Sequence, residues 1–307
     1  AYLTRALALR DAWAEGGGRA AWHDAVTEDR RRPPFHPFIG TVAMAGARRD
    51  ATSARVVNAA FAVLLVPSVY GLAVLAGGPA AGWLAVALVC AMPGTWALGA
   101  RFLPELPTMA LVSATVLALL RSDGFARRWA SLAAGVGLGG CALMKVTAPL
   151  MLAGPLGVAA WPVLRATGPA RLHLLLAVGV GLLLAAPWYV LNGKTAAWFA
   201  WFISAGPGSP VFGNGASGVA GAIRFLKESA MWGMSWPVAV ALIPAILLAV
   251  RQTRMGSPDH RRAVLAMGTW LAISLVAVLA GHNRDPRLLA SAWPAAAILV
   301  AAGWSRL

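Results

Sequence analysis

Charged side chains are scarce in this chain. Only 12% of its 307 residues are Asp, Glu, Lys or Arg, whereas a soluble domain has about 25%. Hydrophobic residues make up 59%, in apolar runs that each approach the roughly 20 residues needed to cross a bilayer. The composition therefore excludes an ordinary soluble domain and predicts an integral membrane protein.

Cysteines and acidic residues are also few. The two cysteines, Cys90 and Cys141, lie in apolar segments and match no zinc, haem or redox spacing, so we interpret them as packing residues. Eleven acidic residues face 26 basic ones, for a net charge of +15. The basic residues stand in short clusters between apolar runs, a pattern that fits membrane topology and not a nucleic-acid binder.

The chain also lacks an initial Met and a basic-then-apolar signal segment. It ends at Leu307, three residues after an apolar run. We expect both ends to be cuts through a longer protein.

Residues 1–53 hold many of the charges and are expected to form an extracytoplasmic loop. The apolar spacing over residues 3–10 predicts a short amphipathic helix on the membrane surface, which the glycines at 16–18 would end. The apolar piece 35–47 is too short to span and follows two prolines, which indicates an interfacial or re-entrant helix.

The remainder, 54–307, is predicted to be a transmembrane helical bundle of about nine spans. Several candidates are short or contain Pro or Gly, which membrane helices tolerate when their neighbours satisfy the freed backbone groups. The expected spans are 54–76, 80–100, 106–121, 129–146, 148–164, 172–190, 236–250, 263–280 and 288–304.

Three arginine-bearing connections set the expected orientation. They hold Arg121, Arg127 and Arg128; Arg165 and Arg171; and Arg251, Arg254, Arg261 and Arg262. By the positive-inside rule this side is the cytoplasm. The opposite, extracytoplasmic side then receives residues 1–53, the connection 101–107, the turn at Lys145, the turn 284–287 and a long connection over 191–235.

The 191–235 connection is rich in Gly, Pro and aromatic residues, and long structured loops are often functional. Trp198 and Trp201 are candidate contacts for substrate in this loop. Their alternative interpretation is an aromatic belt at the membrane interface.

Six segments together resemble the GT-C membrane glycosyltransferases, in the branch (glycosyltransferase family 39-like) of protein O-mannosyltransferases and the aminoarabinose transferase of lipid A. The resemblance covers nearly the whole chain. The segments are RPPFHPF at 32–38, SARVVNAAFAVLLVPSVYGLA at 53–73, RFLPELP at 101–107, GLGGCALMK at 137–145, AAPWYV at 185–190 and DPRLLASAWP at 285–294. The fold class it implies is an all-α, multi-span GT-C-type bundle with an amphipathic extracytoplasmic first loop.

The resemblance implies transfer of a sugar from a polyprenyl phosphate carrier to an acceptor hydroxyl, with inversion at the anomeric carbon. Two acidic residues usually matter in the family. Glu105 matches the one in the second extracytoplasmic loop, although Asp is common there. A carboxylate at this place can accept the acceptor's proton or support the group that does. The alternative role of Glu105 is to begin a helix, where the helix dipole favours an acidic residue. The other acidic residue is expected upstream of Ala1. Its possible substitutes within the chain, which could equally belong to a solvated surface, are Asp11, Asp24, Glu28 and Asp29.

The leaving group is a lipid phosphate, whose charge needs cationic partners. Arg287, Lys145 and Arg101 are the candidates, at helix ends on the extracytoplasmic side, and snorkelling to the interface is their alternative role. His36 lies on the same side and is a candidate for contact with substrate. No paired spacing of His and carboxylate residues indicates a metal site. A divalent ion is therefore not indicated by the sequence, and it is not excluded.

The predicted function is therefore a polyprenyl-phosphate-sugar-dependent glycosyltransferase of the inner membrane, with its active face extracytoplasmic. Its partners would be a lipid-linked sugar donor, a glycan, lipid or protein acceptor, and membrane lipids, with no nucleic acid. Two alternatives stay open at this point: a multi-span transporter or permease, and a non-catalytic GT-C-like membrane subunit.

Overall fold

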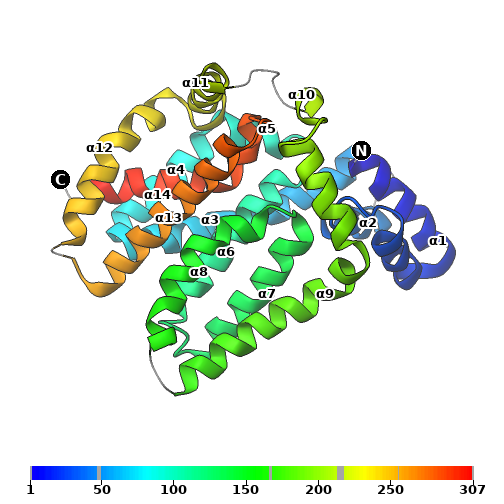
Figure 1. Ribbon diagram of the computed structural model, residues 1–307, viewed down its shortest axis with the longest axis horizontal. Helices are drawn as coiled ribbons and strands as arrows, with labels where there is room; N and C mark the ends of the chain where they lie inside the picture. The colour runs from blue at the N-terminus through cyan, green and yellow to red at the C-terminus, as the bar shows by residue number, and fades with distance from the viewer. Residues whose placement is uncertain (1, 47–49, 166–167, 213–217, 255, 306–307) are drawn as a thin grey trace.

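The computed structural model describes residues 2–46, 50–165, 168–212, 218–254 and 256–305, which form helices and no strand (Figure 1). The predicted all-α class is confirmed. The helices are α1 (Tyr2–Thr27), α2 (Phe35–Ala45), α3 (Ala51–Gly77), α4 (Pro79–Ala91), α5 (Pro93–Gly99), α6 (Glu105–Arg121), α7 (Arg128–Met144), α8 (Ala148–Arg165), α9 (Pro169–Ser204), α10 (Ser209–Phe212), α11 (Gly218–Glu228), η1 (Ser229–Met234), α12 (Trp236–Thr253), α13 (Pro258–Ala280), η2 (Pro286–Ala292) and α14 (Trp293–Trp304).

All nine expected membrane segments are helical, but they are not nine full-length spans. Among the described residues, α3, α9, α12, α13 and the segment Pro286–Trp304 are long and apolar enough to cross a membrane. The helices α4 and α5 form a sixth, broken candidate, bent by 62° where Pro93 follows Met92. The expected spans 106–121, 129–146 and 148–164 correspond to α6, α7 and α8, which have 17, 17 and 18 residues and are not among these candidates.

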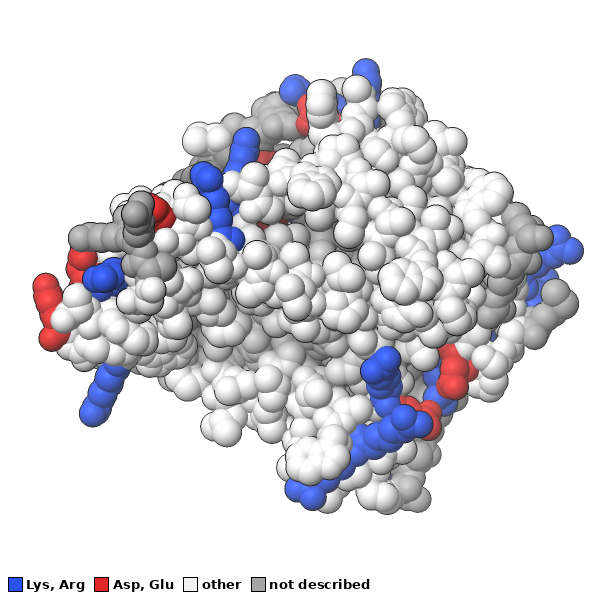
Figure 2. Space-filling model, turned by 180° about the vertical axis from the view of Figure 1, so that it is seen from behind, with Lys and Arg blue, Asp and Glu red and all other residues white. Residues whose placement is uncertain are grey.

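Charge is distributed over the surface as a membrane protein requires. Figure 2 shows a broad band of uncharged side chains between two groups of Lys and Arg side chains. Many large apolar side chains of α9 and α12 are exposed, among them Leu183, Val190, Ile243 and Leu247. Exposed apolar surface of this extent is typical of a face that contacts membrane lipid or another protein.

The core surrounds α14, which packs against α3, α4, α12 and α13 (Figure 1). Its residues from Trp293 to Gly303 are buried, and most are small. A Cβ at Gly303 would stand 2.6 Å from the carbonyl oxygen of Ala245 in α12, so only glycine permits this approach. Small residues let membrane helices pack closely, which is how they associate without a hydrophobic driving force.

Glycines also join α7 to α9. A Cβ at Gly135 would clash with the backbone of Ala177, and one at Gly139 would lie 2.9 Å from the carbonyl oxygen of Gly181. The glycine-rich sequence before Lys145 therefore serves the packing of α7 against α9.

The N-terminal helices α1 and α2 pack together at one end of the molecule (Figure 1). The expected stop at residues 16–18 is a kink, because Gly17 has φ 71° and ψ −168° and the helix resumes after it. The expected short helix after the prolines is α2, which Thr41 ties to α1 by donating to the carbonyl of Ala6 at 3.0 Å.

The expected long connection over 191–235 needs correction. Helix α9 continues to Ser204, and α11 and η1 occupy much of the remainder. The polar residue Asn192 does not end the helix, because its side chain donates to the carbonyls of Val26 and Trp188. Residues 213–217 of this segment lie outside the described residues.

Candidate functional site

A cavity of about 540 Å³ lies where the first residues of α1 meet the start of α6, the end of α7 and the segment before η2. It brings together side chains that are far apart in sequence. It is lined by Tyr2, Leu3, Arg32, Ala51, Arg55, Arg101, Phe102, Leu103, Glu105, Lys145, Phe199, Ile203, Asn283, Arg287 and Leu288.

Glu105 is the buried acid of this cavity. It is the first residue of α6, where the helix dipole favours a carboxylate. Lys145, the residue directly after α7, places its Nζ 3.5 Å from Oε1 of Glu105. The other carboxylate oxygen, Oε2, has no hydrogen-bond partner among the described residues. The pair therefore leaves one oxygen that can accept a proton or a hydrogen bond.

Asn58 of α3 shapes the loop that presents Glu105. Its Nδ2 donates to the carbonyls of Gly99 at 2.9 Å and Arg101 at 2.7 Å. These bonds hold the backbone between α5 and α6, which contains Arg101 and ends at Pro104. Asn58 is not among the site residues expected from the sequence, although a polar residue within an apolar span is a signal of function.

The expected cations Arg101 and Arg287 line the cavity together with Lys145, but Arg287 is not free. Its Nε lies 2.8 Å from Oδ2 of Asp285. Arg284, which is also next to Asp285 in sequence, donates to the backbone carbonyls of Leu279, Gly281 and Gly218.

Arg32 and Arg55 are cavity cations that the sequence analysis missed. The guanidinium carbon of Arg32 lies 5.3 Å from the ring centroid of Tyr2 and 5.6 Å from that of Phe199. Cation–π contacts of this kind orient a guanidinium without cancelling its charge. Burial, and next the charge of Glu105, raise the pKa of Tyr2 to about 12, so its hydroxyl remains a hydrogen-bond donor.

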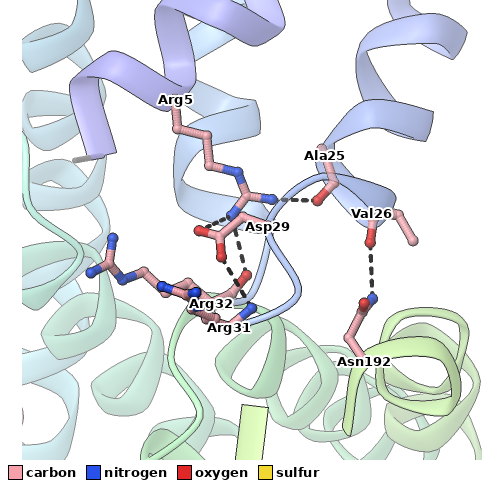
Figure 3. A network of polar contacts seen from close by, with 7 residues as sticks. All are labelled: Arg5, Ala25, Val26, Asp29, Arg31, Arg32 and Asn192. Atoms are coloured by element: carbon pink, nitrogen blue, oxygen red, sulfur yellow. Dashed lines mark hydrogen bonds and ion pairs between the residues drawn. The ribbon is translucent and has the colours of Figure 1, made fainter. Parts of the chain in front are cut away.

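A polar network fixes the turn that carries Arg32 (Figure 3). Arg5 donates to Oδ2 of Asp29 at 3.0 Å, to the carbonyl of Arg32 at 3.2 Å and to that of Ala25. Burial lowers the pKa of Arg5. Asn192 reaches the same region from α9 through the carbonyl of Val26 (Figure 3). The position of Arg32 therefore depends on both α1 and α9.

His36, Trp198 and Trp201 do not line the cavity. His36 is fully buried behind Phe102, with ring centroids 4.1 Å apart, and burial lowers its pKa to about 3. Trp198 and Trp201 are each 53% exposed on α9. Because this segment is a helix and not a loop, Phe199 and Ile203 face the cavity in their place.

An apolar groove of about 470 Å³ adjoins the cavity between α3, α4 and α5. Arg55 lines both hollows, and Leu106 of the groove follows Glu105 in sequence. The groove is lined by Arg55, Asn58, Ala59, Ala62, Leu65, Val66, Val69, Val86, Val89, Cys90, Thr95, Trp96, Gly99, Ala100 and Leu106. Among the described residues, no group of three or more His, Cys, Asp or Glu side chains could hold a metal ion.

The fold is similar to solved structures of ArnT from Cupriavidus metallidurans. The apo structure aligns with a TM-score of 0.72 at 20% identity, and the structure bound to undecaprenyl phosphate with 0.74 at 21%. These alignments cover 100% and 99% of this chain, and 55% of each ArnT chain. This chain therefore spans about half of the length of those proteins. At this level of sequence identity the likeness shows a shared fold. The expected GT-C-type bundle is therefore confirmed.

The fold is also similar, more distantly, to the apo structure of the oligosaccharyltransferase from Archaeoglobus fulgidus. The TM-score is 0.53 at 14% identity, over 88% of this chain and 42% of that one. Curated protein sequences gave no match. Residues 31–191, more than half of the chain, match the dolichyl-phosphate-mannose-protein mannosyltransferase family, and the chain belongs to that family.

Proposed function

We propose that this chain is the catalytic membrane part of a glycosyltransferase that moves a sugar from a polyprenyl phosphate to an acceptor hydroxyl. The observation that carries the proposal is the free Oε2 of Glu105, in a cavity lined by cations. Family membership and the ArnT structure with bound undecaprenyl phosphate support the same chemistry. They do not favour the permease alternative.

The proposed reaction is an inverting displacement. The acceptor oxygen attacks the anomeric carbon while the bond from that carbon to the phosphate oxygen breaks. The electron pair leaves with the polyprenyl phosphate, and the acceptor proton passes to Oε2 of Glu105. Lys145, held against Oε1, orients the carboxylate.

The polyprenyl-phosphate sugar would occupy both the apolar groove and the Glu105 cavity, according to their charge and shape. The apolar groove suits the first isoprene units, and Arg55 stands where the groove meets the cavity. Arg32, Arg101 and Arg287 would face the phosphate, where a guanidinium can donate two hydrogen bonds. The 540 Å³ cavity would then hold the sugar and the acceptor hydroxyl.

Glu105→Gln in the full-length protein tests the catalytic role. The change keeps the volume but removes the base, so sugar transfer should fall about a hundred- to ten-thousand-fold, with donor binding nearly unchanged. The matched control is Glu15→Gln, an exposed glutamate of α1. Wild-type turnover by Glu105→Gln would reduce Glu105 to a helix-start residue and restore the non-catalytic subunit as the better hypothesis.

The active face is proposed to be extracytoplasmic, in the inner membrane, because the arginine-bearing connections lie at the other end of the bundle. Single cysteines test this in a protein without Cys90 and Cys141. Val219→Cys, exposed near the cavity end, should react with an impermeant thiol reagent in intact cells, and Ser257→Cys should be protected. The reverse pattern would invert the topology.

A further inference from the structure

A third hollow, of about 810 Å³, lies between α8, α13 and the end of α12. It stands at the opposite end of α8 and α13 from the Glu105 cavity. Helix α8 begins three residues after Lys145 and reaches the hollow at Trp161, and α13 leaves it and ends three residues before Asn283. The 23 residues of α13 rise about 35 Å, close to the roughly 30 Å of a hydrocarbon core. The hollow therefore opens near a membrane surface.

We propose that this groove binds an anionic phospholipid. It is lined by Ala153, Gly154, Gly157, Val158, Trp161, Pro162, Thr253, Arg254, Gly256, Pro258, Arg261, Arg262, Leu265 and Thr269. The lining has three arginines and no acidic residue. A basic pocket between membrane helices on the arginine-rich side is the kind of site that holds a negatively charged headgroup.

Two of the three arginines keep their charge available. Arg262 donates to Oδ1 of Asp123 at 2.9 Å and lies 4.0 Å from Asp259. The exposed side chains of Arg254 and Arg261 form no ion pair with any residue that the structure describes. A phosphodiester between them would meet uncompensated positive charge.

The deeper walls are apolar and suit an acyl chain. Gly154 packs directly on Thr269, where a Cβ would lie 2.7 Å from that residue's Cβ, so α8 and α13 touch there. At Gly157, three residues further along α8, a Cβ would meet nothing within 4 Å. Val158 and Leu265 line the same space, and Trp161 is 58% exposed at its rim. This combination of apolar wall and cationic rim matches an amphiphile better than a free phosphate ion.

The test uses the purified full-length protein in detergent, with dioctanoyl phosphatidylglycerol, dioctanoyl phosphatidylcholine and inorganic phosphate as probes. Binding is read as bound lipid by native mass spectrometry and as a shift in melting temperature. Phosphatidylglycerol should bind at least ten-fold more tightly than phosphatidylcholine, and inorganic phosphate should not displace it. Equal affinity for the two lipids, or displacement by inorganic phosphate, would overturn the proposal.

Two test variants, each with a matched control variant, localise the binding. Gly157→Leu fills the groove and should abolish phosphatidylglycerol binding, whereas Gly179→Leu, at an equally open position on α9, should not.

The charge of the groove is tested separately. Arg254→Gln with Arg261→Gln should weaken phosphatidylglycerol binding roughly ten-fold, because each basic residue near an anionic headgroup contributes to attraction. Arg127→Gln with Arg128→Gln removes the same charge from another connection and should have little effect. Equal losses in the two double variants, or full binding by Gly157→Leu, would contradict a site in this groove.

The inference does not depend on sugar transfer. Glu105→Gln protein should bind phosphatidylglycerol as the wild type does, because the two sites stand at opposite ends of α8 and α13. If the phosphatidylglycerol tests contradicted the lipid site, the proposed sugar transfer would be unaffected. If the Glu105→Gln test contradicted sugar transfer, the lipid site would be unaffected.

Discussion

The two ends of the bundle each contain a lysine or arginine paired with a carboxylate, and the pairs differ in burial. At the cavity end, Lys145 and Glu105 lie 3.5 Å apart with side chains 16% and 8% exposed. At the arginine-rich end, Arg262 and Asp123 are closer, at 2.9 Å, but 39% and 54% exposed. Exposed pairs are typically worth about 0–1 kcal/mol, whereas removal of one partner of a buried pair costs about 3–5 kcal/mol. Burial and not distance should therefore decide which pair matters.

Lys145→Met gives the largest expected effect. It leaves the buried carboxylate of Glu105 without its cation, so the free energy of unfolding should fall by about 3 kcal/mol. The double variant with Glu105→Gln should recover much of the loss, because it removes the buried charge as well. Denaturant unfolding in detergent of the wild type, Lys145→Met, Glu105→Gln and the double variant measures the coupling energy between the two side chains. Additive losses would show that the pair is as solvated as the one at the other end.

Arg32→Gln should weaken donor binding about ten- to a hundred-fold, the usual value of a charged hydrogen bond. Arg287→Ala should weaken it less, because Asp285 already offsets part of that charge. Arg287→Lys should retain part of the donor affinity, because a single ammonium group replaces a guanidinium that can donate two hydrogen bonds to one phosphate. Donor affinity of full-length variants in nanodiscs, without acceptor, measures the order. A larger loss in Arg287→Ala would assign the phosphate to Arg287.

His36 predicts a pH dependence at the cavity end. Its pKa is about 3 when folded, because of burial, against about 6.5 when unfolded. The unfolded state therefore binds more protons below pH 6.5, and stability is full above that pH and falls as the pH drops toward 3. Between pH 7 and pH 5 the loss should be about 2 kcal/mol. His36→Phe should reduce this slope in melting measurements, and an unchanged slope would show that other groups cause it.

Arg262→Gln gives the smallest expected effect. Its pair with Asp123 is exposed, so stability should change by less than about 1 kcal/mol, and added salt should reduce the change further. Denaturant unfolding at low and high salt measures both. A loss as large as that of Lys145→Met would remove the distinction between the two ends.

The fold was largely predictable from the chain. All nine of the expected apolar spans are helical, and the prolines before residue 35 correctly placed a short helix after them. The exceptions depended on contacts. Helix α9 continues past residue 190 because Asn192 finds carbonyl partners on α1 and on its own helix. The helix at the N-terminus resumes after Gly17 because its second part packs on α2, which no local pattern shows.

The candidate site was predictable only in part. The resemblance located Glu105 and three cations that line the cavity, but it also placed Trp198 and Trp201 in a loop that is helical. Arg32 and Arg55 were missed because both stand in basic, partly polar segments where many arginines look alike. Which of those arginines faces inward depends on the Arg5–Asp29 network and on α9.

The sequence by itself determined that this is an all-α membrane protein with an acidic residue at the start of a helix, because hydrophobicity and helix-end preferences act over a few neighbouring residues. Only the tertiary structure decided that Glu105 meets Lys145, that Asp285 holds Arg287, and that Arg254 and Arg261 face a groove. Most of these groups come from different helices, or differ only in which way a turn points them. Their contacts depend on how the helices pack, and the glycines that allow that packing act between segments far apart in the chain.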